Sequence, residues 1–316
     1  MRLAEPVRLA AAWERAVRCG DFVDAWRIND LVLSRGERVP DDPSLPYHLR
    51  FVWDGRPFDA RHVLVRCYHG LGDTLQFIRY LPPLRRRAAS VTLEAQPELI
   101  PLLHGMPSVD RLVPFRVEGP LSPSECDIEV MELAHALRLH PGIVRPPYLF
   151  IPPSLVAETR QRLGPGFRIG ICCRSGDWDP GRSIPPAALS AALPSSACKV
   201  KLQPGACPDI AWANPLDALD DIMQTAALIC AADLIITADT MIAHFAGALG
   251  QPAILLLKHR ADWRWMDGRS DSPWYPSMRL YRQMQPGRWT EPLAGVAQDV
   301  LERLHRSTPD RPPPPA

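Results

Sequence analysis

One glycine-rich turn places residues that could do chemistry directly after a short apolar run. Its sequence is Gly70-Leu71-Gly72-Asp73-Thr74. Glycines let a backbone approach a ligand closely, and unpaired amides at a helix start favour an anion, so Gly70, Gly72 and Thr74 would line a binding site. The Asp73 carboxylate would be either a base or a helix cap, and local sequence alone favours the cap. The turn is not a dinucleotide-binding fingerprint, because the third glycine of that motif falls at Leu75.

A second turn follows the buried-strand pattern Leu234-Ile235-Ile236-Thr237 and reads Ala238-Asp239-Thr240-Met241-Ile242-Ala243-His244. Asp239 would accept hydrogen bonds from sugar or ribose hydroxyls while the amides of the next helix hold a diphosphate. His244 lies four residues after Thr240, on the same helical face. The alternative is a helix cap with His244 as a hydrogen-bonded core histidine, and local sequence favours neither interpretation.

A third segment is the polar stretch 174–183, which contains Arg174 and Arg182. A guanidinium there would suit a diphosphate. The alternative is a solvated loop, which the sequence favours more strongly for Arg174 than for Arg182. Gln203 ends a neighbouring apolar run and would border the same site. Trp and Tyr side chains within 262–265 and 272–276 would stack on a base or sugar, although such clusters more often serve packing.

Alternating strands and helices position these turns. Apolar runs predict strands at 62–67, 91–94, 109–113 and 127–130, and again at 168–172, 198–202, 234–237 and 253–257. Helical patterns lie at 74–81, 97–103, 154–163, 186–193, 220–232 and 240–249. The alternation predicts an α/β protein with two Rossmann-like domains and a cleft between them. Ligands bind such sheets at the carboxyl ends of the strands, where these turns lie.

Glycine and proline divide the chain into segments. Residues 1–40 predict a helical hairpin like one degenerate tetratricopeptide unit, followed by a proline-rich connector. One such unit cannot bury its apolar face alone, so it packs on the following domain or belongs to a longer array. Residues 50–150 and 151–306 are the two predicted Rossmann-like domains, and 307–316 is a predicted disordered proline-rich tail.

Composition excludes several classes of protein. The 316 residues are 46% apolar and 22% charged, as in a soluble globular chain. A net charge of +1 excludes a broad electrostatic grip on nucleic acid or an anionic membrane. Neither a signal peptide nor an apolar run of about 18 residues occurs, which predicts a cytoplasmic protein without a transmembrane segment. The eight cysteines lack paired or metal-binding spacing, which predicts reduced thiols and no metal site.

Taken in order, these segments resemble the family 9 glycosyltransferases, the group of the ADP-heptose:lipopolysaccharide heptosyltransferases. The closest likeness is to the bacterial branch fused to tetratricopeptide repeats. The matching segments are Gly70 to Pro82, Arg182-Ser183, Leu202-Gln203-Pro204-Gly205, Thr225 to Ile229, Asp239-Thr240 with His244, Ala246 to Gly250, Asp262-Trp263-Arg264-Trp265 and Asp271-Ser272-Pro273-Trp274-Tyr275-Pro276. They span roughly residues 50 to 290.

The resemblance implies a GT-B architecture, with the acceptor on the N-terminal domain and a nucleotide-sugar donor on the C-terminal one. It implies that Asp73 deprotonates the acceptor hydroxyl. It also implies that Asp239, Thr240 and His244 border the donor, and that Arg182 neutralises the leaving diphosphate without a metal. No cofactor is implied, since the nucleotide sugar is a co-substrate.

The expected function is transfer of a heptose or hexose from a nucleotide diphosphate to a polysaccharide, lipid-linked or protein acceptor. Two other classes stay open: a non-catalytic scaffold, and a nucleotide-sugar epimerase on the same fold. The chain departs from the family pattern at Tyr68-His69, where relatives carry Glu-Gln, and at Cys173-Arg174-Ser175, where they carry a Trp and small residues. Both departures adjoin the candidate turns and leave the particular donor and acceptor open.

Overall fold

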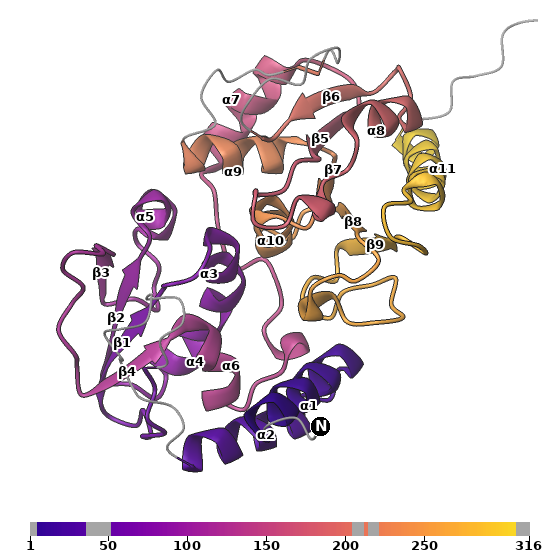
Figure 1. The fold of residues 1–316 in the computed structure, drawn as a ribbon. Coiled ribbons are helices and arrows are strands. Elements are labelled where there is room, and N and C mark those ends of the chain that lie inside the picture. Colours follow the sequence, from indigo (N-terminus) through magenta and orange to yellow (C-terminus); the bar gives the residue numbers. More distant parts are fainter. Residues whose placement is uncertain (1–4, 36–51, 204–211, 214–220, 308–316) are drawn as a thin grey trace, which may run out of the picture. The chain divides into compact units, whose positions relative to one another are not determined.

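The computed structural model describes residues 5–35, 52–203, 212–213 and 221–307, and the chain divides into two units whose elements are labelled in Figure 1. The first unit contains the described residues up to Leu149 together with Asp262–Arg269, and the second contains Phe150–Ala261 and the chain from Ser270. The predicted second domain, 151–306, thus includes one segment that the structure groups with the first unit. The predicted connector and tail, and Pro204-Gly205, lie outside the described residues.

A helical hairpin opens the first unit, as the sequence predicts. It consists of α1 (Glu5–Cys19) and α2 (Phe22–Ser34). Gly20 makes the turn with a φ of 78°, which glycine adopts without strain, and Asp21 caps α2 through the Asp24 amide. The apolar cluster of the hairpin contains Ala16, Val17 and Ala25, with Trp13, Phe22 and Trp263 packed against it. The hairpin therefore buries its apolar face within its own unit.

A four-stranded parallel sheet with the order β3-β2-β1-β4 forms the core of the first unit. Its strands are β1 (His62–Arg66), β2 (Ser90–Ala95), β3 (Arg111–Pro114) and β4 (Cys126–Glu129). Val63, Leu64 and Val65 of the central strand are all buried. Such an uninterrupted apolar run suits a parallel strand that is covered on both faces.

Short helices accompany these strands in the first unit. They are α3 (Leu71–Phe77), α4 (Leu81–Arg85), α5 (Ile100–Leu103), α6 (Leu133–Ala136) and the 3-10 turns η2 (Ile78–Tyr80), η3 (Pro97–Leu99), η4 (Val130–Glu132), η5 (Pro141–Ile143) and η7 (Trp263–Trp265). The predicted helix at 74–81 begins earlier, at Leu71. Pro82 and Pro83 occupy the first turn of α4, where helix amides have no intrahelical partner and a missing N–H does no harm.

The second unit contains a five-stranded parallel sheet with the order β6-β5-β7-β8-β9. Its strands are β5 (Arg168–Cys172), β6 (Cys198–Lys201), β7 (Leu234–Ala238), β8 (Ala253–Leu257) and β9 (Met278–Arg282). Its helices are α7 (Pro153–Leu163), η6 (Pro180–Arg182), α8 (Pro186–Ala192), α9 (Ile222–Ala231), α10 (Met241–Ala248) and α11 (Thr290–Ser307). Ile171, Ile236 and Leu256 lie in one buried cluster between these layers.

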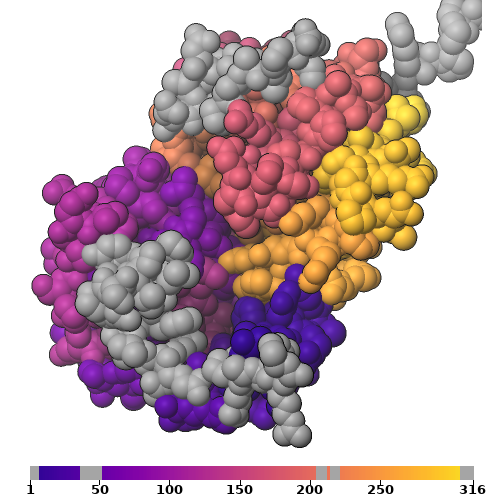
Figure 2. All heavy atoms as spheres, viewed as in Figure 1, coloured from indigo at the N-terminus to yellow at the C-terminus, as the bar shows by residue number. Residues whose placement is uncertain are grey.

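Sequence reasoning missed β9 and α11. The strand β9 is short and contains two arginines, so it lacks the apolar run of its neighbours. Helix α11 did carry a signal, because Leu293, Val296 and Val300 recur at helical spacing and all three are buried in the core of the second unit. The opposite side of this helix lies at the surface, where it is the yellow element of Figure 2.

Each sheet has one topological switch point. In the first unit the chain moves outward from β1 to β2 and β3, then returns to β4 on the other side of β1. In the second unit it moves from β5 to β6, then places β7 on the other side of β5. Open α/β sheets bind ligands outside the carboxyl ends of the strands at this point. The α/β prediction of two parallel sheets behind a helical hairpin is confirmed.

Candidate active-site residues

Asp73 lies at the switch point of the first unit, in the first turn of α3. Its Oδ2 accepts a hydrogen bond from the Gly70 amide at 3.1 Å, so the side chain closes the start of the helix. It does so from the third helical position rather than as the N-cap itself, which is Gly70. Its Oδ1 accepts a hydrogen bond from Arg264 Nη2 at 2.5 Å. The capping interaction expected from the sequence is therefore present, joined by an ion pair that the sequence did not reveal.

Arg264 holds Asp73 from a distant part of the chain. Its Nε donates to Gln76 Oε1 at 3.0 Å and its Nη1 to Asp262 Oδ1 at 2.9 Å. Its guanidinium lies over the Trp263 ring, 4.7 Å from the centroid. The Trp263 ring in turn meets Trp13 of α1 edge-on at 5.2 Å, so the hairpin packs directly behind the turn that carries this arginine.

A buried carboxyl group, Glu129, lies close to Asp73. It ends β4, is almost fully buried, and accepts a hydrogen bond from the Met131 amide at 2.7 Å through Oε2. Among the described residues, nothing donates a hydrogen bond to its Oε1. Burial raises the pKa of Glu129 well above its usual range, and the neighbouring charges of Glu132 and Asp73 raise it further. His69, directly before the glycine turn, brings its Nε2 within 3.8 Å of Glu129 Oε2.

The remaining residues of the first turn serve its shape. Gly70 has an ordinary φ of −68°, but a Cβ there would lie 3.3 Å from the Asp73 carboxylate, so the glycine leaves room for the cap. Thr74 is fully buried and donates to Gln96 Oε1 at 2.9 Å. Gln96 then donates to the His69 carbonyl at 2.7 Å. Gly72 lies in the first turn of α3. The ligand contacts predicted for Gly70, Gly72 and Thr74 stay predictions.

Asp239 and Thr240 lie at the switch point of the second unit, directly after β7. Thr240 is the N-cap of α10, and its Oγ1 accepts a hydrogen bond from the Ile242 amide at 3.2 Å. The cap that the sequence allowed at this turn is thus formed by Thr240 and not by Asp239. Asp239 is buried, and its carbonyl accepts a hydrogen bond from Arg182 Nη1 at 2.7 Å.

Arg182 is the cation at this switch point. It lies in η6, is mostly buried, and stacks on Trp178 with its guanidinium carbon 4.0 Å from the ring centroid. Its Nε lies 3.7 Å from Asp179 Oδ2, and Lys258 Nζ approaches the same oxygen at 2.6 Å. Two cations, one from the loop after β5 and one from the end of β8, thus share one carboxylate. The structure thus brings the guanidinium of Arg182, in the segment 174–183, to the main-chain carbonyl of Asp239, in the turn after β7.

Gln203 follows β6 at the carboxyl end of the strand, as predicted, and its contact with the donor stays a prediction. Its side chain is buried, and its Oε1 accepts hydrogen bonds from the amides of Cys173 and Arg174 at 2.7 and 2.8 Å. These amides follow β5, so Gln203 shapes the start of the loop that carries Arg182. A second contact, between Ser175 Oγ and Ser183 Oγ at 2.9 Å, joins the two ends of that loop.

His244 is a buried, hydrogen-bonded histidine. Its Nδ1 lies 3.0 Å from the hydroxyl of Tyr275, and the two rings meet at 64°. Tyr275 also covers Gly247, one helical turn further along α10, where an added Cβ would lie 2.3 Å from the ring. A larger residue at 247 would displace Tyr275 and with it the partner of His244.

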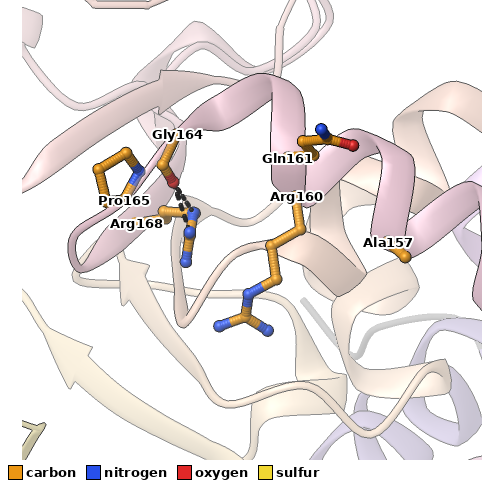
Figure 3. A pocket seen from close by; sticks show the side chains of 6 residues that line it. All are labelled: Ala157, Arg160, Gln161, Gly164, Pro165 and Arg168. Atoms are coloured by element: carbon orange, nitrogen blue, oxygen red, sulfur yellow. Dashed lines mark hydrogen bonds between the residues drawn. The ribbon is translucent and has the colours of Figure 1, made fainter.

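A hollow lies away from these turns. It measures ≈ 450 Å³ and is lined by Ala157, Arg160, Gln161, Gly164, Pro165 and Arg168 (Figure 3). It lies at the amino end of β5, opposite the switch point. Arg160 and Arg168 both bind Asp233, and Arg168 also donates to the Gly164 carbonyl, as the dashed line in Figure 3 shows. The described residues contain no group of three or more His, Cys, Asp or Glu that could hold a metal ion.

Sequence reasoning missed several residues that surround the predicted ones. Glu129 and Lys258 follow or end apolar strands, and that position at a carboxyl end could have singled them out. Arg264 and Tyr275 were noted as parts of aromatic segments that resemble the family, without a role of their own. Their contacts with Asp73 and His244 join residues far apart in the chain, which no local pattern indicates.

Known structures share this fold. A glycosyl transferase family 9 protein from Veillonella parvula superposes with a TM-score of 0.57 at 11% identity, covering 80% of this chain and 99% of that one. The ADP-heptose lps heptosyltransferase II of E. coli gives 0.53 at 17% identity, covering 78% and 98%. The iron-containing dodecameric glycosyltransferase TibC of enterotoxigenic E. coli gives 0.51 at 16% identity, covering 80% and 78%. The chain therefore has the fold of family 9 glycosyltransferases and heptosyltransferases, as the resemblance implied.

Sequence comparison adds one relative. Protein FlbA of Caulobacter vibrioides is 26% identical over 294 residues, which cover 78% of this chain. The match takes in 47% of FlbA, so the chain spans about half the length of the curated relative it matches. No family model matches the chain.

Proposed function

We propose that this chain is a glycosyltransferase that moves a heptose or hexose from a nucleotide diphosphate to a polysaccharide, lipid-linked or protein acceptor. The observation that carries the proposal is the chemistry of the two switch points. The first unit offers a carboxylate, Asp73, and the second offers a cation, Arg182, beside the helix start at Thr240. Both lie on a fold shared with family 9 glycosyltransferases.

Sugar transfer needs both of these groups. A base takes the proton of the acceptor hydroxyl as its oxygen attacks the anomeric carbon, and a cation offsets the charge of the departing diphosphate. Asp73 is the proposed base. A carboxylate has about four lone-pair positions, so the bonds from Gly70 and Arg264 leave room for a hydroxyl.

The donor side belongs to the second unit in this proposal. Arg182 takes the diphosphate charge without a metal, while Asp239, Thr240 and His244 border the nucleotide sugar. The positive end of the α10 dipole adds attraction for an anion. The nucleotide sugar is a co-substrate, and the proposed place of reaction is the cytoplasm.

A non-catalytic scaffold is the second candidate. Its support is the engagement of both Asp73 oxygens, which a purely structural cap and ion pair would also produce. A binding site for nucleotides would not be expected in a scaffold.

Calorimetry and product analysis of the full chain test the proposal. The protein is titrated with ADP and UDP, then incubated with ADP-heptose and UDP-hexoses, alone and with lipopolysaccharide, lipid-linked or protein acceptors. We expect nucleotide binding and acceptor-dependent release of nucleoside diphosphate, with the sugar mass added to one acceptor. Absence of any nucleotide binding would favour the scaffold, whereas a donor isomerised without acceptor would favour an epimerase.

A further inference from the structure

The segment that carries Arg264 has little structure of its own. It belongs to the first unit and contains only the single 3-10 turn η7, whose hydrogen-bond geometry is poorer than that of an α-helix. The turn ends at Met266, which has a φ of 48°, in the left-handed region that non-glycine residues rarely adopt. A residue keeps such a conformation only when its surroundings hold it there. Contacts from elsewhere in the unit must therefore fix the backbone on which Arg264 lies.

The helical hairpin supplies such contacts on both sides of Arg264. Before it, the Trp263 ring meets Trp13 of α1 edge-on, with the ring centroids 5.2 Å apart. After it, the Asp267 amide donates to the Arg18 carbonyl at 3.1 Å, and the Arg18 Nη1 lies 3.4 Å from Asp267 Oδ1. An aromatic contact and a backbone hydrogen bond thus bind the hairpin to the two flanks of the residue that reaches Asp73.

Arg264 in turn fixes the direction of the Asp73 carboxylate. The guanidinium is 8% exposed and donates to Asp73, to Gln76 of the same helix α3 and to Asp262 of its own turn. A planar guanidinium that bonds three acceptors at once has one orientation that satisfies all of them. Asp73 Oδ1 is therefore held at a set place, while Oδ2 faces the Gly70 amide.

We propose that Arg264 is a positioning residue for Asp73, and that the helical hairpin, through Trp13 and Arg18, holds Arg264 in place. The inference rests on the glycosyltransferase function proposed above, in which Asp73 alone takes the hydroxyl proton. Neither the arginine nor the hairpin touches the reacting atoms. Misplacement of a reacting group by about 1 Å can cost about 10² in rate, so a small shift of η7 is enough to matter. The hairpin then serves the reaction as well as covering its own unit.

Trp13→Ala tests the inference in the full chain, with the donor and acceptor established as described above. We expect kcat to fall about 10-fold, with the affinity for nucleoside diphosphate unchanged, because the donor side belongs to the second unit in the proposed function. Trp13→Phe keeps an aromatic ring against Trp263 and should restore most of the rate. Asp30→Asn is the matched control, since it removes a bond from the hairpin to His135 of the same unit without touching η7. This control should turn over like the wild type.

A double-substitution cycle separates positioning from a general loss of structure. If Trp13 acts through Asp73, then Trp13→Ala should change kcat less than about twofold in a chain that already carries Asp73→Asn. The same cycle with Arg264→Gln should behave alike. An equal fold-loss in both backgrounds would overturn the inference, and so would an unchanged kcat in Trp13→Ala.

Hydrogen exchange at the Gly70 amide tests the positioning without any turnover. This amide donates to Asp73 Oδ2, so release of the carboxylate exposes it to solvent. We expect it to exchange about 10-fold faster in Trp13→Ala and Arg264→Gln than in the wild type and Asp30→Asn, with the amides of β1 unchanged. Equal exchange at Gly70 in all four proteins would overturn the inference. A wild type that turns over no nucleotide sugar would instead overturn the proposed function, and faster exchange would still support the positioning of Asp73.

Discussion

The carboxyl ends of the two sheets have opposite chemistry on the same topology. At the switch point of the first unit lie the carboxyl groups of Asp73 and Glu129, with one arginine bound to Asp73. At that of the second unit lies Arg182, which shares Asp179 with Lys258 from the end of β8. In the function proposed above, the first edge takes up a proton and the second binds an anion. The comparison teaches that a repeated architecture fixes where a site lies, while a few side chains decide its chemistry.

These carboxyl-terminal edges of the two sheets also differ in the contacts that hold their side chains in place. In the first unit, the cation that binds Asp73 comes from η7, which packs against Trp13 of the helical hairpin. In the second unit, Arg182 is held by its own loop and by the carbonyl of Asp239. Both edges therefore depend on segments distant in the chain, across 191 positions in the first unit and 57 in the second.

Removing the negative charge of the first edge should give the largest effect. For Asp73→Asn we expect kcat to fall by about 10²–10⁴ with nucleotide affinity retained, because the amide cannot take the hydroxyl proton. The measurement is steady-state release of nucleoside diphosphate, with calorimetry for affinity. Asp59→Asn is the matched control, since it also removes an ion pair with an arginine of the first unit, at an exposed position. Unchanged turnover in Asp73→Asn would refute the base assignment.

Removing the cation of the second edge should give a somewhat smaller effect. For Arg182→Gln we expect kcat to fall by about 10²–10³, the usual effect of losing one group that stabilises developing charge. Affinity for ADP or UDP should fall as well, which separates this variant from Asp73→Asn. Arg160→Gln removes an arginine at the opposite end of β5 and serves as the control. Equal nucleotide affinity in both variants would place the diphosphate elsewhere.

Crowding Tyr275 should weaken the second unit. For Gly247→Ala we expect a loss of about 1–3 kcal/mol in unfolding free energy, because the added methyl group would overlap the buried ring. Denaturant unfolding measures it. Gly142→Ala is the control, since a Cβ there meets nothing within 4 Å. A stability equal to that of the control would show that Tyr275 moves without loss.

The buried acid of the first unit should give an effect on stability that depends on pH. Its raised pKa means that the native state keeps a proton that the unfolded chain releases above the ordinary carboxyl range. This contribution to stability is complete below that range and is lost as pH rises, by up to about 1.4 kcal/mol per pH unit. Glu129→Gln does not titrate, so its melting temperature relative to the wild type should rise from about pH 5 to about pH 8. Exposed Glu98→Gln should show no such trend, and a flat difference for Glu129→Gln would contradict the burial argument.

The sequence by itself determined the order of strands and helices and the two turns at their carboxyl ends. Apolar runs and glycine, threonine and aspartate at helix starts are local signals, so β1, β5, β7 and α10 lie close to where they were predicted. The turn residues Asp73 and Thr240 also show their caps in the local sequence. Local sequence does not decide whether these two residues act as caps or as catalytic groups.

Tertiary structure alone decided which side chains surround these turns. Arg264 reaches Asp73 across 191 positions of sequence, and Tyr275 reaches His244 across 31. The approach of His69 to Glu129 likewise depends on the pairing of β1 with β4. Periodicity and turn chemistry describe a residue and its near neighbours, whereas these contacts follow from strand order and from the return of the Asp262–Arg269 segment to the first unit. The charge of each edge is for that reason a property of the folded chain.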